Sequence, residues 1–351
     1  MKTKLARQSN FELLRVIAMC LIILGHYGQA ISQSTVPMTR LCRYLIEFGC
    51  AHGQMAANCF ILITGYFMVG REKIKPSSVV KLVLTVILYS WGIAAIFYVC
   101  HLPMEGMDGI SGYLQILFPV SCRHWWFISA YVGLYILIPY INRMIEHIDK
   151  TEFQRLLLIL FLMMSVIPTF TVSDTWVSDL AWVITLYSMG AYLKKFSEDT
   201  KRYSTVTFGV LALLGMIVLG GSVILLNQFP SICQKLGGDG YFRSINKLPT
   251  ALTSVFVFLW FSRIKIGNRA WINTLGKATF GVYLIHMHLL VESLLWKPFV
   301  ARPWMYGNVR YVLLSVILVP IGILLVCSVI EIVRVKLFDF IERRIARKSQ
   351  S

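Results

Sequence analysis

Long apolar runs alternate with short basic connections along almost the whole chain. A helix needs about 20 mostly apolar residues to cross the hydrocarbon core of a bilayer. Ten runs approach this length, so we predict an all-α polytopic membrane protein of about ten transmembrane helices. A further apolar segment, 110–120, is too short to span and predicts an interfacial or re-entrant helix. The predicted spans are 11–31, 44–70, 79–100, 124–141, 155–172, 177–193, 204–226, 248–262, 272–295 and 311–333.

Composition supports lipid as the solvent for most of this surface. Of the 351 residues, 57% are hydrophobic and 15% are charged, whereas a soluble protein carries roughly 25% charged residues. No polar stretch is long enough for a second domain. We therefore predict a single membrane-embedded domain over 1–351, with a basic tail at 340–351. The eight cysteines form no CxxC pair, so no metal site is predicted.

The basic residues behind the net charge of +17 are distributed as expected for a membrane topology and not for a nucleic-acid surface. The basic residues lie between apolar runs and form no stripe on one polar face, so a nucleic-acid partner is not expected. With ten spans, one side holds 23 basic residues, including Lys2, Lys4 and Arg7, and the opposite loops hold nine. Cytoplasmic loops carry the excess of Lys and Arg. Both termini are therefore predicted to be cytoplasmic.

The first span places three ionisable residues in an otherwise apolar sequence. Arg15 and His26 are eleven positions apart, about three full turns plus ~20°, so they share one helix face, about 16 Å apart along the axis. Glu12 precedes Arg15 by three residues, which is salt-bridge spacing on a helix. Ionisable groups at membrane depth are costly and usually mark function.

Structural alternatives exist for these residues. Arg15 can extend to the headgroups while paired with Glu12, since long basic side chains often do so near helix ends. His26 lies too deep for this, although a buried neutral histidine bonded to a neighbouring helix would also fit.

Four motifs in order resemble acyltransferase family 3, a group of bacterial inner-membrane acyltransferases with ten core helices. Arg15, ten residues and His26 are similar to its Arg-x10-His signature, with Glu12 where the family often has Asp. The resemblance extends over about residues 8 to 340. The further matching segments are Asn58–Tyr66 (NCFILITGY), Trp125–Phe127 with Gly133–Pro139, and Thr279–His286 (TFGVYLIH).

The resemblance implies transfer of an acyl group, acetyl or succinyl, from cytoplasmic acyl-CoA to a hydroxyl of a surface or exported glycan. Glu12, Arg15 and His26 would form the catalytic group. His26 would act either as a general base or through a covalent acyl-histidine. Arg15, Arg71 and Lys73 would bind the anionic donor, because Arg grips phosphate well. For Arg71 and Lys73 the alternative is plain positive-inside topology.

Other polar and aromatic residues are candidates for the oxyanion or the acceptor. Three of them have a structural alternative: Thr64 can bond its own helix backbone, Trp126 can belong to the interfacial aromatic belt, and His286 can make an inter-helix hydrogen bond. The candidates are Asn58, Thr64, Tyr66, Arg123, Trp126, Tyr283 and His286.

The predicted enzyme binds no resident cofactor and uses acetyl-CoA, or another acyl-CoA, as a substrate. It is expected in the bacterial cytoplasmic membrane, acting on a glycan or lipid-linked glycan. The alternatives are a transporter or flippase for a glycan precursor or small solute, and a sensing or uptake module. The chain shows no internal repeat of the kind found in many transporters, and no appended domain is expected.

Overall fold

The computed structural model describes residues 8–32, 36–105, 107 and 109–348. Within these residues the chain is all-helical, with 80% helix and no strand. The elements are α1 Ser9–Ser32, α2 Arg40–Cys50, α3 Gly53–Met68, α4 Pro76–Val99, α5 Gly109–Leu117, α6 Trp126–His147, α7 Lys150–Phe161, the π-helix η1 Leu162–Val166, α8 Ile167–Thr171, α9 Asp179–Lys195, α10 Glu198–Lys201, α11 Thr205–Gln228, α12 Pro230–Lys235, α13 Leu248–Arg263, α14 Ala270–His286, α15 Leu289–Val300, the 3-10 helix η2 Pro303–Gly307 and α16 Val309–Lys348.

Six helical segments in the described part of the chain are long and apolar enough to cross a membrane: α1, α4, α6, α7–α8, α11 and α16. The bent pair α14–α15 makes a seventh if it is one span. The shorter α3, α9 and α13 have 16, 17 and 16 residues. These helices fit a multi-pass membrane protein, whereas the count of ten and the cytoplasmic termini remain predictions. Lys2, Lys4 and Arg7 lie outside the described residues, as do the last three residues of the predicted tail.

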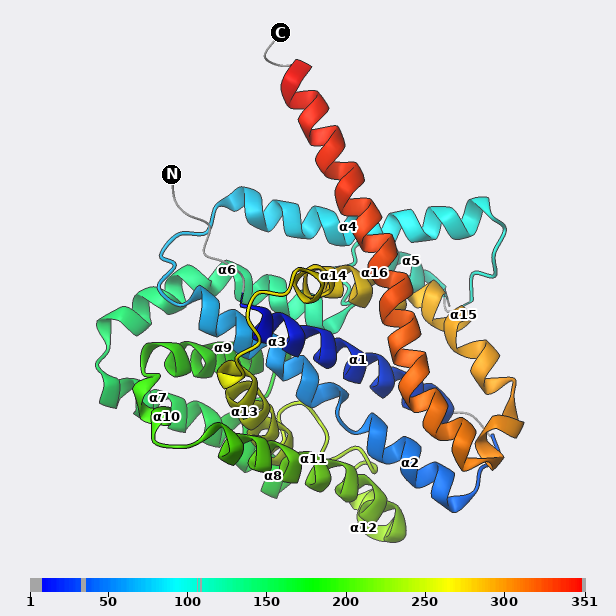
Figure 1. Cartoon of the computed structure of the whole chain (residues 1–351), viewed down its shortest axis with the longest axis horizontal. Helices are drawn as coiled ribbons and strands as arrows, with labels where there is room; N and C mark the ends of the chain where they lie inside the picture. Colours follow the sequence, from blue (N-terminus) through cyan, green and yellow to red (C-terminus); the bar gives the residue numbers. More distant parts are fainter. Residues whose placement is uncertain (1–7, 33–35, 106, 108, 349–351) are drawn as a thin grey trace.

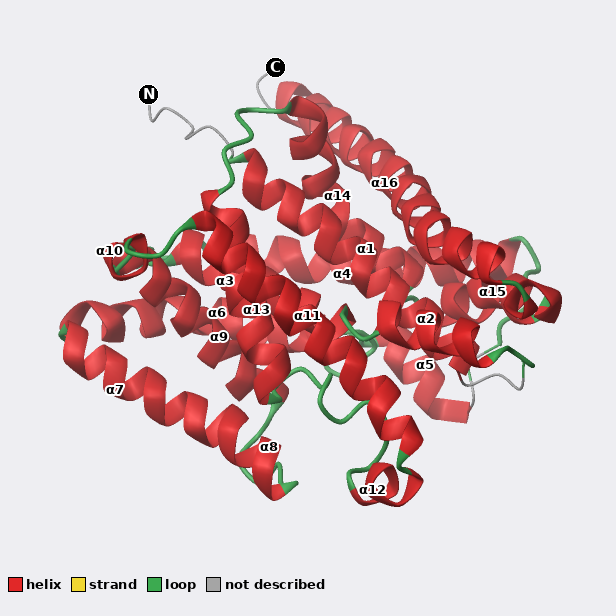
Figure 2. Ribbon diagram, turned by 60° about the horizontal axis from the view of Figure 1, so that its bottom comes forward, coloured by secondary structure: helices red, strands yellow, loops and turns green. Residues whose placement is uncertain are grey.

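α1 lies at the centre of the helical assembly, where it packs against α2, α3, α13, α14 and α16 (Figures 1 and 2). It runs parallel to α14, because the hydroxyl of Ser9 donates to Asn273 at 2.9 Å near one end, and His26 meets His286 near the other. α16 runs the opposite way and projects beyond the rest of the molecule at its C-terminal end (Figure 1). At its start, Tyr306 of η2 contacts the hydroxyl of Tyr27 at 3.1 Å.

The second predicted span, 44–70, is not one helix. α2 ends at Cys50 and α3 begins at Gly53. The buried His52 lies at the break, and its ring nitrogens lie 3.2 Å from the carbonyl oxygen of Gly49 and 3.0 Å from that of Met216 in α11. The break therefore places the polar ring of His52 between two backbone carbonyl oxygens.

The ninth predicted span, 272–295, bends by 86° between α14 and α15. His288 stabilises the bend, because its Nδ1 accepts from the backbone N–H of Leu290 at 3.2 Å and its Nε2 bonds the carbonyl of Ser90 at 3.1 Å. Glu292, which the sequence placed on the helix of His286, therefore lies on α15.

α3 and α9 approach each other backbone to backbone through a pair of glycines. A methyl group on Gly65 would collide with the carbonyl oxygen of Tyr187, and one on Gly190 would collide with that of Leu62. Small residues permit such close crossings between membrane helices. This crossing fixes α3, which lies directly against α1.

We predict that Gly190→Ala lowers the thermal stability of the detergent-purified protein, because overpacking a close contact costs typically about 1–3 kcal/mol. Gly92→Ala in α4 is the matched control, since a methyl group there meets nothing within 4 Å. Its melting temperature should equal or exceed that of the wild type, because alanine is the better helix former. Equal melting temperatures for the two variants would contradict the close α3–α9 crossing.

Candidate functional site

A cavity of about 710 Å³ lies between α1, α3, α6 and α14, and we call it the central cavity. Arg15 and His26 both line it, as their shared helix face predicted. Because α1 is surrounded by other helices, its polar face has this cavity in place of lipid. The further residues used below that line it are Gln54, Thr64, Trp126, Tyr131, Arg243, Lys277, Tyr283 and Glu292.

The predicted pair at the start of α1 is present. Arg15 donates from Nη1 to Oε1 of Glu12 at 2.8 Å, and 26% of the Arg15 side chain remains exposed against 5% for Glu12. Glu12 packs directly on Gly276 of α14, where a methyl group would overlap its carboxylate. The carboxylate is thus fixed between two helices and orients the guanidinium, while Arg15 still faces the cavity.

His26 contacts His286 across the α1–α14 interface. Nδ1 of His26 lies 3.2 Å from Nε2 of His286, and Nδ1 of His286 lies 2.6 Å from the carbonyl oxygen of Val282. A carbonyl oxygen only accepts, so Nδ1 of His286 carries the proton and, in the neutral ring, Nε2 carries the lone pair. Nδ1 of His26 must then donate to it. This chain of hydrogen bonds leaves the lone pair of His26 on Nε2.

Three further predicted residues share the central cavity with His26. Tyr283 stands one turn before His286, with ring centroids 5.9 Å apart. Trp126 begins α6 and also lines a second cavity. Thr64 lines the cavity, but its hydroxyl donates to the carbonyl of Phe60 at 2.9 Å, which is the backbone bond named above as its alternative.

Asn58 and Tyr66 are not brought to this cavity by the structure. Asn58 is fully buried and donates to the carbonyl of Ile245 and to Ser254, while its oxygen accepts from Trp182. Its amide is thereby occupied in holding helices together. Tyr66 instead lines a separate cavity of about 780 Å³ near the start of α1, under the ammonium of Lys194.

Arg71 and Lys73 lie on the exposed connection after α3 and line none of these cavities within the described residues. Arg123 lies just before α6 in a left-handed backbone conformation, with φ of 54°, and forms an ion pair with Asp179 of α9. It lines the second cavity rather than the central one.

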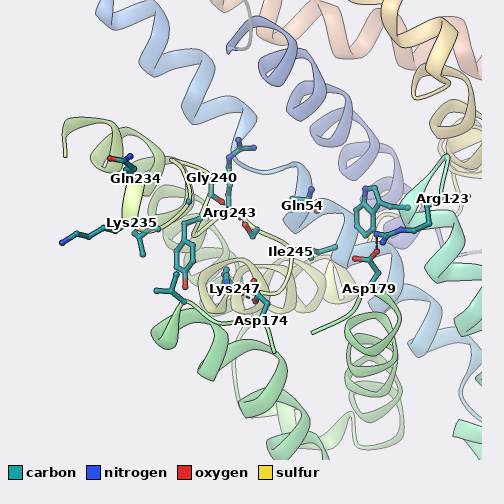
Figure 3. A pocket seen from close by; sticks show the side chains of 16 residues that line it. Gln54, Arg123, Asp174, Asp179, Gln234, Lys235, Gly240, Arg243, Ile245 and Lys247 are labelled. Carbon is teal, nitrogen blue, oxygen red and sulfur yellow. Dashed lines mark hydrogen bonds and ion pairs between the residues drawn. The ribbon is translucent and has the colours of Figure 1, made fainter. Parts of the chain in front are cut away.

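The second cavity, about 780 Å³, is formed largely by the connection between α12 and α13, and we call it the loop cavity. Figure 3 shows Arg123 beside Asp179 on one side of it and Lys247 close to Asp174 on another. Gln54, Trp126 and Arg243 line both cavities. The two cavities are therefore adjacent, and polar lining residues form a path from Arg15 past His26 to the loop.

Sequence reasoning missed two basic residues of this path. Lys277 of α14 follows Gly276, the residue on which Glu12 packs, so it lies at the Arg15 end of the central cavity. Its signal was available, because it is an ionisable residue inside an apolar span, as Arg15 is. Arg243 lies in the charged loop 235–247, for which contact with an acceptor and a solvated loop were both open, and no local pattern distinguishes it from the other basic residues there.

Comparison with known proteins agrees with the motifs. A family model described as an acyltransferase domain matches residues 8–330, nearly the whole chain. Neither the search of curated proteins nor that of solved structures found a match. The match supports an enzyme, which the motifs already favoured over a transporter or an uptake module. The chain belongs to acyltransferase family 3 and is a membrane acyltransferase.

Proposed function

We propose that this protein transfers an acyl group, acetyl in the first place, from cytoplasmic acyl-CoA to a hydroxyl of a surface or exported glycan in the bacterial cytoplasmic membrane. The observation that carries the proposal is His26, whose Nε2 lone pair is fixed by His286 inside a cavity with basic residues at both ends. Such a fixed imidazole is suited to take a proton from a hydroxyl.

The donor would enter at the end marked by Arg15 and Lys277. Both line the central cavity, and Arg15 is oriented by Glu12. The phosphates of acyl-CoA are anionic, and guanidinium groups bind phosphate in a planar, bidentate manner. The thin pantetheine arm would then extend along the face of α1 toward His26. Arg71 and Lys73, exposed on the connection after α3, would contact the donor only outside the cavity.

In the proposed transfer, His26 alone accepts the proton and later returns it. Nε2 of His26 takes the proton of the acceptor hydroxyl while that oxygen attacks the thioester carbonyl. The tetrahedral intermediate collapses, the C–S bond breaks and the sulfur leaves. The imidazolium returns its proton to the sulfur and yields free CoA. An acyl-histidine formed by attack of the same Nε2 is the two-step alternative.

The oxyanion requires a hydrogen-bond donor within the cavity. The hydroxyl of Tyr283 is the best placed of the predicted candidates, because it lies on the same helix as His286 and makes no hydrogen bond to any described residue. Thr64 is less suited, since its hydroxyl already donates to its own helix.

The proposal is tested in proteoliposomes that hold donor and acceptor on opposite sides of the membrane. Acetyl-CoA is supplied on the side of the N-terminus. The acceptor is surface glycan of the producing bacterium, freed of its esters by mild alkali. Mass spectrometry should show acetylated glycan on the far side, and His26→Ala should reduce its formation at least about 100-fold, the lower range of general-base contributions. Transfer only when both substrates share a compartment would contradict the proposed transfer from a cytoplasmic donor to an external acceptor.

Donor binding should depend on the cations of the cavity. Arg15→Gln should raise the apparent KM for acetyl-CoA about tenfold or more, because a hydrogen bond to a charged group contributes roughly 1.5–3 kcal/mol. Lys277→Gln should act in the same direction. Arg71→Gln should change the KM less, since an exposed charge is screened. A larger effect of Arg71→Gln than of Arg15→Gln would place the donor outside the central cavity.

His286 should behave as a positioning residue for His26. His286→Leu removes the acceptor for Nδ1–H of His26 and frees the ring to change tautomer, so we expect kcat to fall about 10- to 100-fold, a part of the general-base contribution. His286→Gln offers a carbonyl oxygen in its place and should retain more activity. The KM for acetyl-CoA should be unchanged in both variants. Equal kcat values for the two variants would argue against the hydrogen-bond chain.

A further inference from the structure

The junction of the two cavities carries polar groups that the protein itself does not use. Gln54 comes from α3, Trp126 from the start of α6 and Arg243 from the connection between α12 and α13, and these three residues line both cavities. Oε1 of Gln54 and Nε of Arg243 are buried and have no hydrogen-bond partner in the described structure. Buried polar atoms are nearly always paired, so an unpaired acceptor and an unpaired donor at one junction indicate a ligand.

Arg243 is also a cation of this region without an ion pair among the described residues. Two other basic residues of the loop cavity are paired: Arg123 with Asp179, and Lys247 with Asp174 at 3.0 Å. Lys235 extends away from the other labelled side chains (Figure 3). Glu47 of α2 acts electrostatically on Arg243, but no ion pair joins them among the described residues.

The unpaired atoms of Gln54 and Arg243 indicate the chemistry of the ligand that they would bind. Oε1 of Gln54 needs a donor and Nε–H of Arg243 needs an acceptor. A carboxylate or phosphate would leave Oε1 of Gln54 unpaired, because neither ionised group has a proton to donate. A hydroxyl both donates and accepts, so the hydroxyls of a sugar would suit both atoms. An aromatic ring at the same place, Trp126, offers a face for the apolar side of a sugar.

We propose that Gln54 and Arg243 bind the acceptor sugar at the junction, each through a ring hydroxyl, with Trp126 against the ring. This site rests on the proposed function and specifies its acceptor as a glycan recognised by neutral hydroxyls. Gln54 and His26 line the same cavity, so a sugar held by Gln54 would lie in the cavity that contains the proposed base. The acceptor thereby approaches His26 from the loop cavity, opposite to the donor.

The test compares Gln54→Met and Arg243→Gln with the wild type in proteoliposomes, using acetyl-CoA and the alkali-treated surface glycan described above. Gln54→Met replaces the amide by an apolar group of similar length, and Arg243→Gln removes the guanidinium and its charge. The apparent KM for the glycan should rise about tenfold or more, as expected for loss of a hydrogen bond in a site built for it. The KM for acetyl-CoA should not change. Arg40→Gln, an exposed residue at the start of α2, is the control that should leave every constant unchanged.

An unchanged glycan KM in both variants would overturn the proposal, and a raised KM for acetyl-CoA would assign the pair to the donor. Glycan binding is measured separately by co-sedimentation with the proteoliposomes, without donor. Binding to the wild type that both variants weaken supports the sugar site even if no acetyl transfer occurs, in which case only the proposed reaction fails. Absence of glycan binding to the wild type overturns the sugar site itself. Competition arms with a neutral glucoside and with glucuronate distinguish the ligand classes, because the proposal requires that the neutral sugar compete at least as well.

Discussion

The parallel contact between α1 and α14 is the constraint on which the site depends. Glu12 packs on Gly276 at one end and His26 meets His286 at the other. Any side chain at 276 would force the helices apart at the Glu12 end. A wider separation would cost the 3.2 Å contact between the two rings. The absence of a side chain at one position therefore supports the geometry of an imidazole several turns away.

The histidines of this protein differ in whether a ring nitrogen remains without a hydrogen bond to the described residues. His288 accepts from the backbone of Leu290 and bonds the carbonyl of Ser90, so both its nitrogens are occupied. His124 is occupied likewise, by the carbonyl of Gln115 and the N–H of Leu289. His26 retains a nitrogen that no described residue engages, and it lines a cavity. Unused hydrogen-bonding capacity, more than residue type, separates the candidate catalytic histidine from the structural ones.

The sequence could predict features that depend on residues close together in the chain, and not those that depend on contacts between distant residues. The salt bridge of Glu12 with Arg15 and the shared face of Arg15 and His26 depend on helix geometry alone, and both are present. The bend after His286 depends on a bond from His288 to Ser90, nearly 200 positions away, and apolar periodicity carries no trace of it. The same holds for Asn58, whose motif looked functional although its amide is consumed by α13 and by Trp182. Apolar length alone does not count the spans either, because α3, α9 and α13 are shorter than a usual span yet lie within the assembly.

The length of α16 links the candidate site to the thickness of the bilayer. Its 40 residues extend about 60 Å at 1.5 Å per residue, while the hydrocarbon layer is only about 30 Å thick. A helix this long fits by tilting or by carrying its basic end out of the lipid. Glu331 of α16, held by Arg334 at 2.7 Å, packs against Gly281 of α14. A change in the tilt or depth of α16 in a membrane would therefore act on the helix that carries His286.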